Sequence, residues 1–249
     1  MTIRRLATGL TAAAAAVLVA ACAYNESLGR NQFLITDNAA LQSSADQAWA
    51  ETLRTQTVSN NAAMNERVRR VGGRIVEAAG MGDRAWEYRV FQDDSPNAFV
   101  LPNGKIGVTT SLLNLVRNDD QLASVIGHEV GHVRAQHAAE RYSQTALTSV
   151  GLQIAQGVAG DYGQAVGALG GVGAQLGVLL PFSRRHELEA DRLGVDYMHE
   201  AGYDPDEAVA LWRIMADQRQ GSTPEFASTH PSDASRIAEL EAYIESRGW

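Results

Sequence analysis

The stretch DDQLASVIGHEVGHVRAQHA, residues 119–138, combines a helical pattern of apolar residues with side chains that bind metal ions. Its apolar positions recur at helical spacing and predict an amphipathic, partly buried helix: Leu122, Val125 and Ile126. His128 and His132 are four residues apart, so their imidazoles lie about 40° apart on one helical face and can bind one ion. Glu129 stands beside them, where it can accept a proton from water rather than bind the ion itself. The HExxH pattern therefore predicts a catalytic site with one zinc ion per chain.

A catalytic zinc site needs a third protein ligand, and we do not expect the same helix to supply it. The longer pattern HExxHxxGxxH is excluded because Ala135 and Ala138 occupy the positions of its glycine and third histidine. His137 lies about 140° around the helix from His132, so we expect it on another face. The alternative to a metal site is a chance pattern on a surface helix. It is disfavoured because buried histidine and glutamate side chains need partners.

Acidic candidates for the third ligand lie in the segment SRRHELEADR, residues 183–192. Glu187 and Asp191 are four residues apart, so they share one face of a helix. Glu187 can bind zinc from that face, and Asp191 can accept the N–H of a zinc-bound histidine. Spacing alone leaves a solvated helix charge as the alternative for Glu187, and it favours that interpretation for Glu189.

The composition excludes several classes of protein. The 249 residues carry a formal net charge of −8, which argues against a general nucleic-acid-binding face. Hydrophobic residues make up 45% of the chain, enough for a packed core. The single cysteine excludes a disulfide framework and a zinc site built mainly from thiolates.

The N-terminal residues predict an export signal. A basic start precedes an apolar run of about 16 residues, which is short for a membrane span but typical of a secretory signal peptide. The run ends in Val-Ala-Ala-Cys at 19–22, which resembles the bacterial lipobox, so we expect Cys22 to be lipid-modified. An incidental cysteine after an ordinary signal peptide is the alternative. We therefore predict a signal peptide at 1–21, a tether at 22–36 and one folded domain at 37–249.

The remaining patterns predict an α+β fold that is mostly α-helical, with a small β-sheet. Residues 86–92 alternate as in a half-buried strand, and the turn Pro-Asn-Gly separates 98–101 from 105–109 as in a hairpin. Residues 143–182 carry one charge and many glycines. We expect close-packed helices there over the active-site helix, with a lid or a surface that meets membrane lipid or unfolded protein as alternatives. Helical patterns cover the other segments: 37–57, 61–80, 111–117, 184–201, 205–219 and 232–246.

Five motifs occur together in this chain: NAFVLPNGKI at 97–106, HEVGH at 128–132, SRRHELEADRLG at 183–194, AGYDP at 201–205 and STHP at 228–231. In combination they resemble the HtpX, CAAX prenyl protease and BepA/LoiP family of zinc metallopeptidases, which are gluzincins. HtpX-like members carry transmembrane helices and BepA-like members a helical-repeat domain, neither of which we expect here. The resemblance is therefore greatest to a stand-alone, LoiP-like outer-membrane lipoprotein protease.

This resemblance implies a gluzincin-type domain with an active-site helix, a second metal-binding helix and a small sheet whose edge strand binds substrate. It also implies that Glu187 is the third zinc ligand and that Asp191 supports the site. The edge strand then contains Asn97, Ala98 and Phe99 as substrate-binding residues. For Asn97, a role as a turn or strand-end residue is the alternative.

His230 lies at a predicted corner between a loop and a helix. The resemblance favours a position near the zinc, where His230 stabilises the oxyanion or fills the open coordination position in a resting state. A histidine that bonds only to local backbone is the alternative. We expect Arg236, one turn further on, to be exposed, with pairing to an acid near the site as the alternative. We expect His186 and His199 on helix surfaces.

The expected function is that of a zinc metalloendopeptidase, which hydrolyses peptide bonds of misfolded or stalled cell-envelope proteins with Glu129 as general base. The alternative is a lipid-anchored, chaperone-like client-binding lipoprotein with a silent or self-blocked zinc site. A structural zinc protein is disfavoured because three ligands leave the site open. We expect the chain at the outer membrane, facing the periplasm, with unfolded or misassembled envelope proteins and the outer-membrane assembly machinery as partners. No nucleic-acid partner is expected.

Overall fold

The computed structural model describes residues 22–35, 38–155, 182–218 and 234–249, together with 226 and 230. The predicted signal peptide and residues 156–181 of the glycine-rich segment lie outside this part of the chain. The fold is α+β and mostly helical, as predicted. The strands are β1 (Cys22–Asn25), β2 (Arg30–Phe33), β3 (Glu87–Phe91), β4 (Ala98–Val100) and β5 (Lys105–Thr109). The helices are α2 (Asn38–Thr55), α3 (Ala62–Ala78), α4 (Thr110–Leu115), α5 (Asp119–Arg134), α6 (His137–Ala155), α8 (Arg184–Glu200), α9 (Asp206–Gln218) and α11 (Ala234–Arg247).

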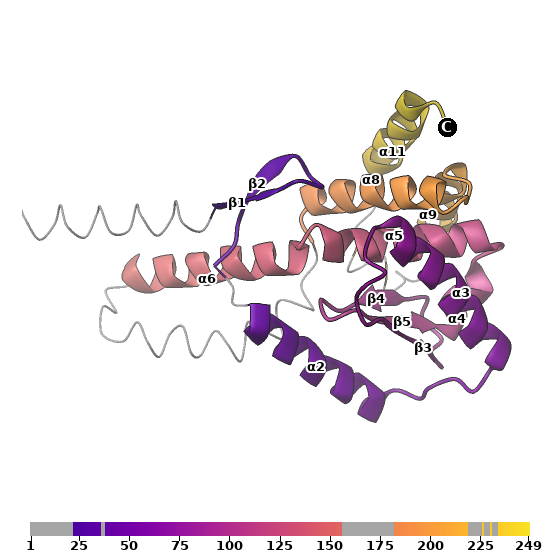
Figure 1. The fold of residues 1–249 in the computed structure, drawn as a ribbon, viewed down its shortest axis with the longest axis horizontal. Coiled ribbons are helices and arrows are strands. Elements are labelled where there is room, and N and C mark those ends of the chain that lie inside the picture. The colour runs from indigo at the N-terminus through magenta and orange to yellow at the C-terminus, as the bar shows by residue number, and fades with distance from the viewer. Residues whose placement is uncertain (1–21, 36–37, 156–181, 219–225, 227–229, 231–233) are drawn as a thin grey trace, which may run out of the picture.

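A three-stranded sheet lies beside α5 (Figure 1). The strand order is β3-β5-β4, with β5 parallel to β3 and antiparallel to β4, so β4 forms one edge of the sheet. The predicted turn joins β4 to β5, and Gly104 in it has a φ of 83°, a left-handed conformation that glycine adopts without strain. On one face of the sheet Trp49 of α2 packs edge-on against Phe91 and Phe99.

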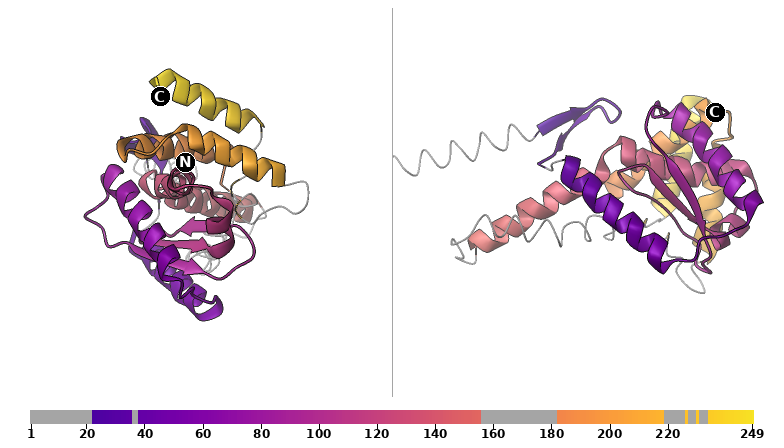
Figure 2. Two further views of the ribbon diagram at one scale, coloured as in Figure 1. Left: turned by 90° about the vertical axis from the view of Figure 1, so that its right-hand side faces the viewer. Right: turned by 60° about the horizontal axis from the view of Figure 1, so that its bottom comes forward.

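The helices are layered on the other side of the sheet. In Figure 2, α11, α8, α5 and the sheet follow one another, and α2 lies beyond the sheet. The apolar face of α5 predicted from the sequence is buried in this stack, with Leu122 and Ile126 fully enclosed. The active-site helix is therefore the central element, held between a sheet edge and a second helix.

Helices α5 and α8 approach so closely that their contact requires residues without large side chains. A Cβ atom added to Gly127 would lie 2.9 Å from the carbonyl oxygen of Gly194, and one added to Gly194 would lie 2.8 Å from the backbone nitrogen of His128. A Cβ added to Gly131 would lie 2.9 Å from the carbonyl oxygen of Ala190. This close packing brings the side chains of α8 within bonding distance of the HExxH residues.

We predict that Gly194→Ala destabilises the fold by about 1–3 kcal/mol, because the added methyl group forces the two helices apart. Gly73→Ala in α3 is the matched control, since nothing lies within 4 Å of the added Cβ. Alanine should stabilise that helix by up to about 1 kcal/mol. Chemical denaturation of both variants measures the difference. Equal stabilities would show that the α5–α8 contact tolerates the extra volume.

The active-site helix is shorter than the sequence predicts. It ends at Arg134, and Gln136 has a φ of 55°, a left-handed conformation that breaks the helix before α6 begins at His137. His137 therefore does not lie on another face of the same helix. It is fully buried, and its Nδ1 lies 2.9 Å from Nδ1 of His132. The prediction failed because a glutamine in this conformation has no sequence signal comparable to glycine.

The predicted tether at 22–36 is instead folded where the structure describes it. β1 and β2 form an antiparallel hairpin that pairs Ala23 with Gln32. The hairpin contacts α6 and α8 through Arg30, whose side chain is 12% exposed. Within the described residues, no helix is both long and apolar enough to cross a membrane.

Candidate metal centre

Helix α5 presents three buried polar side chains in its C-terminal half: His128, Glu129 and His132. The helix begins where the side chain of Asn118 accepts a hydrogen bond from the backbone N–H of Gln121. Asp119 and Asp120 in the first turn interact favourably with the helix dipole. The polar residues are thus fixed on a helix whose start is capped and whose apolar side is buried.

Four side chains from three parts of the chain meet at this point: His128, His132, Glu187 and His230. Nε2 of His128 lies 3.1 Å from Nε2 of His132 and 3.1 Å from Nδ1 of His230. The Glu187 carboxylate lies 3.1 Å from His230 Nδ1 and 3.5 Å from Nε2 of each of the other two histidines. The structure therefore brings together the three predicted ligands and places His230 beside them, where the family resemblance favoured it.

The spacing of these atoms fits a tetrahedral metal ion. Zinc bonds of about 2.0–2.1 Å place neighbouring ligand atoms about 3.3–3.4 Å apart. Imidazole nitrogens with one carboxylate are also a donor set that zinc accepts. Beside the cluster, Glu129 Oε1 is buried and makes no hydrogen bond within the described part of the chain, although it lies 3.2 Å from Nε2 of His230. The residues present therefore fit a bound zinc ion.

Asp191 and Arg236 lie behind the ligands. Asp191 Oδ1 lies 2.9 Å from Nδ1 of His128, which leaves Nε2 of that ring to face the centre. Arg236 donates to Asp191 over 2.5 and 2.7 Å, and its Nη1 lies 2.8 Å from Glu187 Oε2. One arginine thus orients both the ligand carboxylate and the carboxylate that supports His128.

The electrostatics of the site separate the roles of its groups. Burial and the neighbouring His128 lower the pKa of His132 well below its usual value, so its ring stays neutral and can bind metal. Burial alone would raise the pKa of Glu187, but hydrogen bonds with His128 and His230 outweigh it and hold that pKa well below the usual range. Burial lowers the pKa of His128, yet Asp191 and Glu187 raise it to about 9, so a metal must displace a proton there.

Glu129 lies between the ligand cluster and the edge strand. Burial raises the pKa of its carboxyl group, as suits a group that accepts and returns a proton. Its Oε2 accepts a hydrogen bond from the backbone N–H of Val100 over 3.1 Å, and its Oε1 lies 3.2 Å from Nε2 of His230. Glu129 therefore contacts the sheet edge without being one of the four atoms that surround the metal position.

The three residues predicted to bind substrate lie at this edge. Ala98 and Phe99 belong to β4, and Asn97 precedes it. The backbone of Asn97 bonds to Thr109, and the Phe99 ring packs with Phe91 on the face covered by α2. Asn97 and Phe99 thus bond inward, toward β5, while the backbone of Ala98 and Val100 faces the opposite side.

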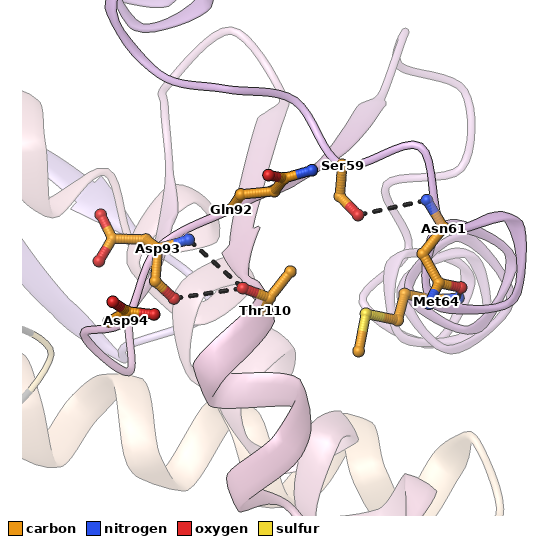
Figure 3. A pocket seen from close by; sticks show the side chains of 7 residues that line it. All are labelled: Ser59, Asn61, Met64, Gln92, Asp93, Asp94 and Thr110. Atoms are coloured by element: carbon orange, nitrogen blue, oxygen red, sulfur yellow. Dashed lines mark hydrogen bonds between the residues drawn. The ribbon is translucent and has the colours of Figure 1, made fainter.

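A cleft of about 420 Å³ opens beside the cluster. Its walls come from several elements, among them Leu41 of α2, Met81 after α3, Val100 of β4, His132 of α5 and Ala139 of α6. A second hollow, shown in Figure 3, lies at the start of α3 and contains none of the cluster residues. Polar groups there bond to one another, as Asp93 does to Thr110. Of these two hollows in the described part of the chain, the first is the one that adjoins the metal position.

Comparison with known proteins identifies the family. Residues 62–244 match the protein family described as Peptidase family M48, and this region contains all four cluster residues. The chain belongs to peptidase family M48. The family resemblance inferred from the motifs is confirmed, and the matched region contains a His/Glu cluster that could hold a metal ion.

Relatives of this M48 domain are named as proteases. The mitochondrial metalloendopeptidase OMA1 of Schizosaccharomyces pombe is 40% identical over 179 residues, which are 71% of this chain and 52% of that protein. The OMA1 metalloendopeptidase of Bos taurus is 32% identical over 212 residues, 80% of this chain and 40% of that protein. The β-barrel assembly-enhancing protease of Escherichia coli is 29% identical over 194 residues, 72% and 39% of the two chains. The chain thus spans about half the length of these relatives, or less.

These relatives correct the predicted location. An outer-membrane lipoprotein facing the periplasm was expected, but four of the matched relatives are named as mitochondrial proteases. That expectation came from the N-terminal signal, which precedes the part that matches M48, and from the LoiP-like resemblance. The outer-membrane assignment is therefore wrong, and lipid modification of Cys22 stays a prediction.

Sequence reasoning placed several residues of the M48 domain wrongly. Arg236, expected to be exposed, is 2% exposed and pairs with two site carboxylates. His186, expected at a helix surface, is buried 3.3 Å from Glu140. Glu189, expected in solvent, bonds to His137 and Arg30. Their partners lie far away in the chain, so helical spacing alone held no signal for these contacts.

Proposed function

We propose that this M48 domain is a zinc-dependent endopeptidase. The observation that carries the proposal is the position of Glu129, whose carboxylate lies between the metal-ligand cluster and the backbone of the edge strand. His128, His132 and Glu187 are the ligands in this proposal, and Asp191 orients His128. Zinc held there supplies Lewis acidity, which polarises a peptide carbonyl and lowers the pKa of water to about 7.

Glu129 performs the proton transfers. Its raised pKa suits it to accept the proton of the attacking water, and its Oε1, which accepts no hydrogen bond among the described residues, is the oxygen that receives it. It then returns that proton to the leaving amine as the peptide bond breaks. The hydrogen bond from Val100 keeps its other oxygen fixed, so the carboxylate does not have to reorient during the reaction.

The substrate is an extended polypeptide segment. The outward N–H and C=O of Ala98 and the outward C=O of Val100 provide one strand edge for it, in the way that a peptide adds to a sheet, while the Val100 N–H stays bonded to Glu129. The 420 Å³ cleft next to Val100 and His132 receives a neighbouring substrate side chain. Such binding selects unfolded chains, so unfolded or misassembled proteins are the proposed substrate class; one relative is named as a β-barrel assembly-enhancing protease.

Incubation with unfolded casein tests this proposal. We expect the purified protein to cleave casein, to lose this activity when a chelator removes its metal, and to regain it when zinc is added. Activity that persists after complete metal removal would exclude the mechanism.

The position of His230 favours a resting state that is closed to water. Its Nδ1 occupies the fourth position of the ligand cluster, which a catalytic zinc site keeps open. We predict that His230→Ala weakens zinc binding about tenfold and increases casein cleavage severalfold, because it frees that position. Chelator competition and initial rates measure the two effects. Reduced cleavage at unchanged zinc affinity would instead indicate that His230 stabilises the transition state.

A further inference from the structure

A second buried polar network lies outside the ligand cluster and joins the N-terminal hairpin to the helices. Arg30 of β2 donates to both carboxylate oxygens of Glu189, over 2.6 and 2.7 Å, and to both of Glu140, over 2.9 and 2.8 Å. Gln32 donates to Glu140 over 2.6 Å and to the carbonyl of Ala135 over 2.8 Å. One guanidinium therefore bridges α6 and α8, while its strand also bonds to the break after α5.

This network reaches a residue of the ligand cluster. Nε2 of His137 lies 3.0 Å from Glu189, and its Nδ1 lies 2.9 Å from Nδ1 of His132. When His137 donates through Nε2 to the carboxylate, its Nδ1 is free to accept the N–H of His132. His132 then presents the lone pair of Nε2 to the metal position, which is the tautomer that a ligand requires.

The two histidines of the HExxH motif are thus supported in different ways. His128 bonds directly to the carboxylate of Asp191. His132 has no carboxylate at its Nδ1 among the described residues and depends on His137 to connect it to Glu189. Besides His137 and Arg30, Glu189 bonds to Arg185, whose side chain is 62% exposed. Arg30, whose side chain is only 12% exposed, fixes this carboxylate through two parallel hydrogen bonds.

We propose that the β1–β2 hairpin is a positioning element of the metal site, in which Arg30 orients His132 through Glu189 and His137. The hairpin precedes residues 62–244, the part that matches M48, so this support comes from outside the matched region. Without Arg30, Glu189 can turn toward Arg185 and solvent, and the His137 ring loses the acceptor that sets its orientation. The inference rests on the proposed zinc site.

The test uses the full protein and the variants Arg30→Ala, His137→Ala and their combination. Zinc affinity is measured by chelator competition, and the visible spectrum of the cobalt-substituted protein reports ligand geometry. We expect each single variant to weaken zinc binding about 10–100-fold, the range for residues that orient a ligand. Because both act on His132 along one path, the double variant should be no weaker than His137→Ala alone. If Arg30 and His137 only stabilised the fold, their fold-losses in zinc affinity would multiply in the double variant, and the cobalt spectrum would not change.

Arg185→Ala is the matched control, because it removes an exposed partner of the same carboxylate and should leave zinc affinity unchanged. If Arg30→Ala does not fold, Glu189→Gln is tested in its place, since this variant keeps the shape of the side chain and removes its charge. If Arg30→Ala or Glu189→Gln binds zinc as tightly as the unmodified protein, this inference is overturned, while the proposed function is not affected. Failure of the unmodified protein to bind zinc would instead refute the proposed function.

Discussion

Glu129→Gln should lower kcat for unfolded casein by about 10²–10⁴-fold while the protein keeps its zinc. Glutamine has nearly the same shape, and its amide oxygen can still accept the hydrogen bond from Val100 N–H. The amide cannot accept the proton of the attacking water, so only the transfer step is lost. Casein cleavage, metal content and melting temperature measured on the same preparation separate these effects.

The control for this prediction is a residue of β4, the edge strand that Glu129 contacts, because this residue does not transfer protons. Ala98→Ser alters a buried side chain of β4 but keeps its outward backbone groups, so it should leave kcat close to that of the unmodified protein. A fully active Glu129→Gln protein would refute the proton-transfer role. Loss of zinc from that variant would mean that Glu129 helps to hold the metal, which the geometry does not indicate, since His230, not Glu129, completes the set of four ligand atoms.

The local parts of the site were predictable from the sequence. The four-residue spacing placed His128 and His132 on one helical face, and the same spacing paired Glu187 with Asp191. In the structure the histidine pair lies on α5 and the carboxylate pair on α8, and the two pairs face each other. These predictions depended only on the regular geometry of a helix, which the tertiary fold did not change.

The long-range parts were not predictable from spacing. Arg30 and Glu189 are 159 residues apart, and the pairing of His128 with His230 spans 102 residues. The break at Gln136 also turned His137 toward His132, although a continuous helix would have turned it away. The glycines of α5 and α8 were the one overlooked sequence signal, because Gly127, Gly131 and Gly194 allow the two backbones to meet.

Arg236→Met should destabilise the metal-free protein by about 3–5 kcal/mol, the cost of breaking a buried ion pair by removing one partner. The guanidinium is 2% exposed, lies over the Trp212 ring at 4.1 Å, and is bonded to Asp191 and Glu187. Methionine preserves much of the packing volume, so the loss reports mainly on the charge. Denaturant titration of the metal-free protein measures it.

Zinc should reduce this loss, because a divalent cation replaces part of the positive charge that Arg236 supplies to Glu187. The control is Arg213→Met, which removes a side chain that is 64% exposed and paired with Glu241 at the surface, and should cost about 1 kcal/mol or less. Were Arg236→Met as stable as Arg213→Met without metal, the buried carboxylates would not depend on the arginine. A smaller loss in the zinc-loaded than in the metal-free Arg236→Met protein would show that zinc and Arg236 both stabilise the Glu187 carboxylate.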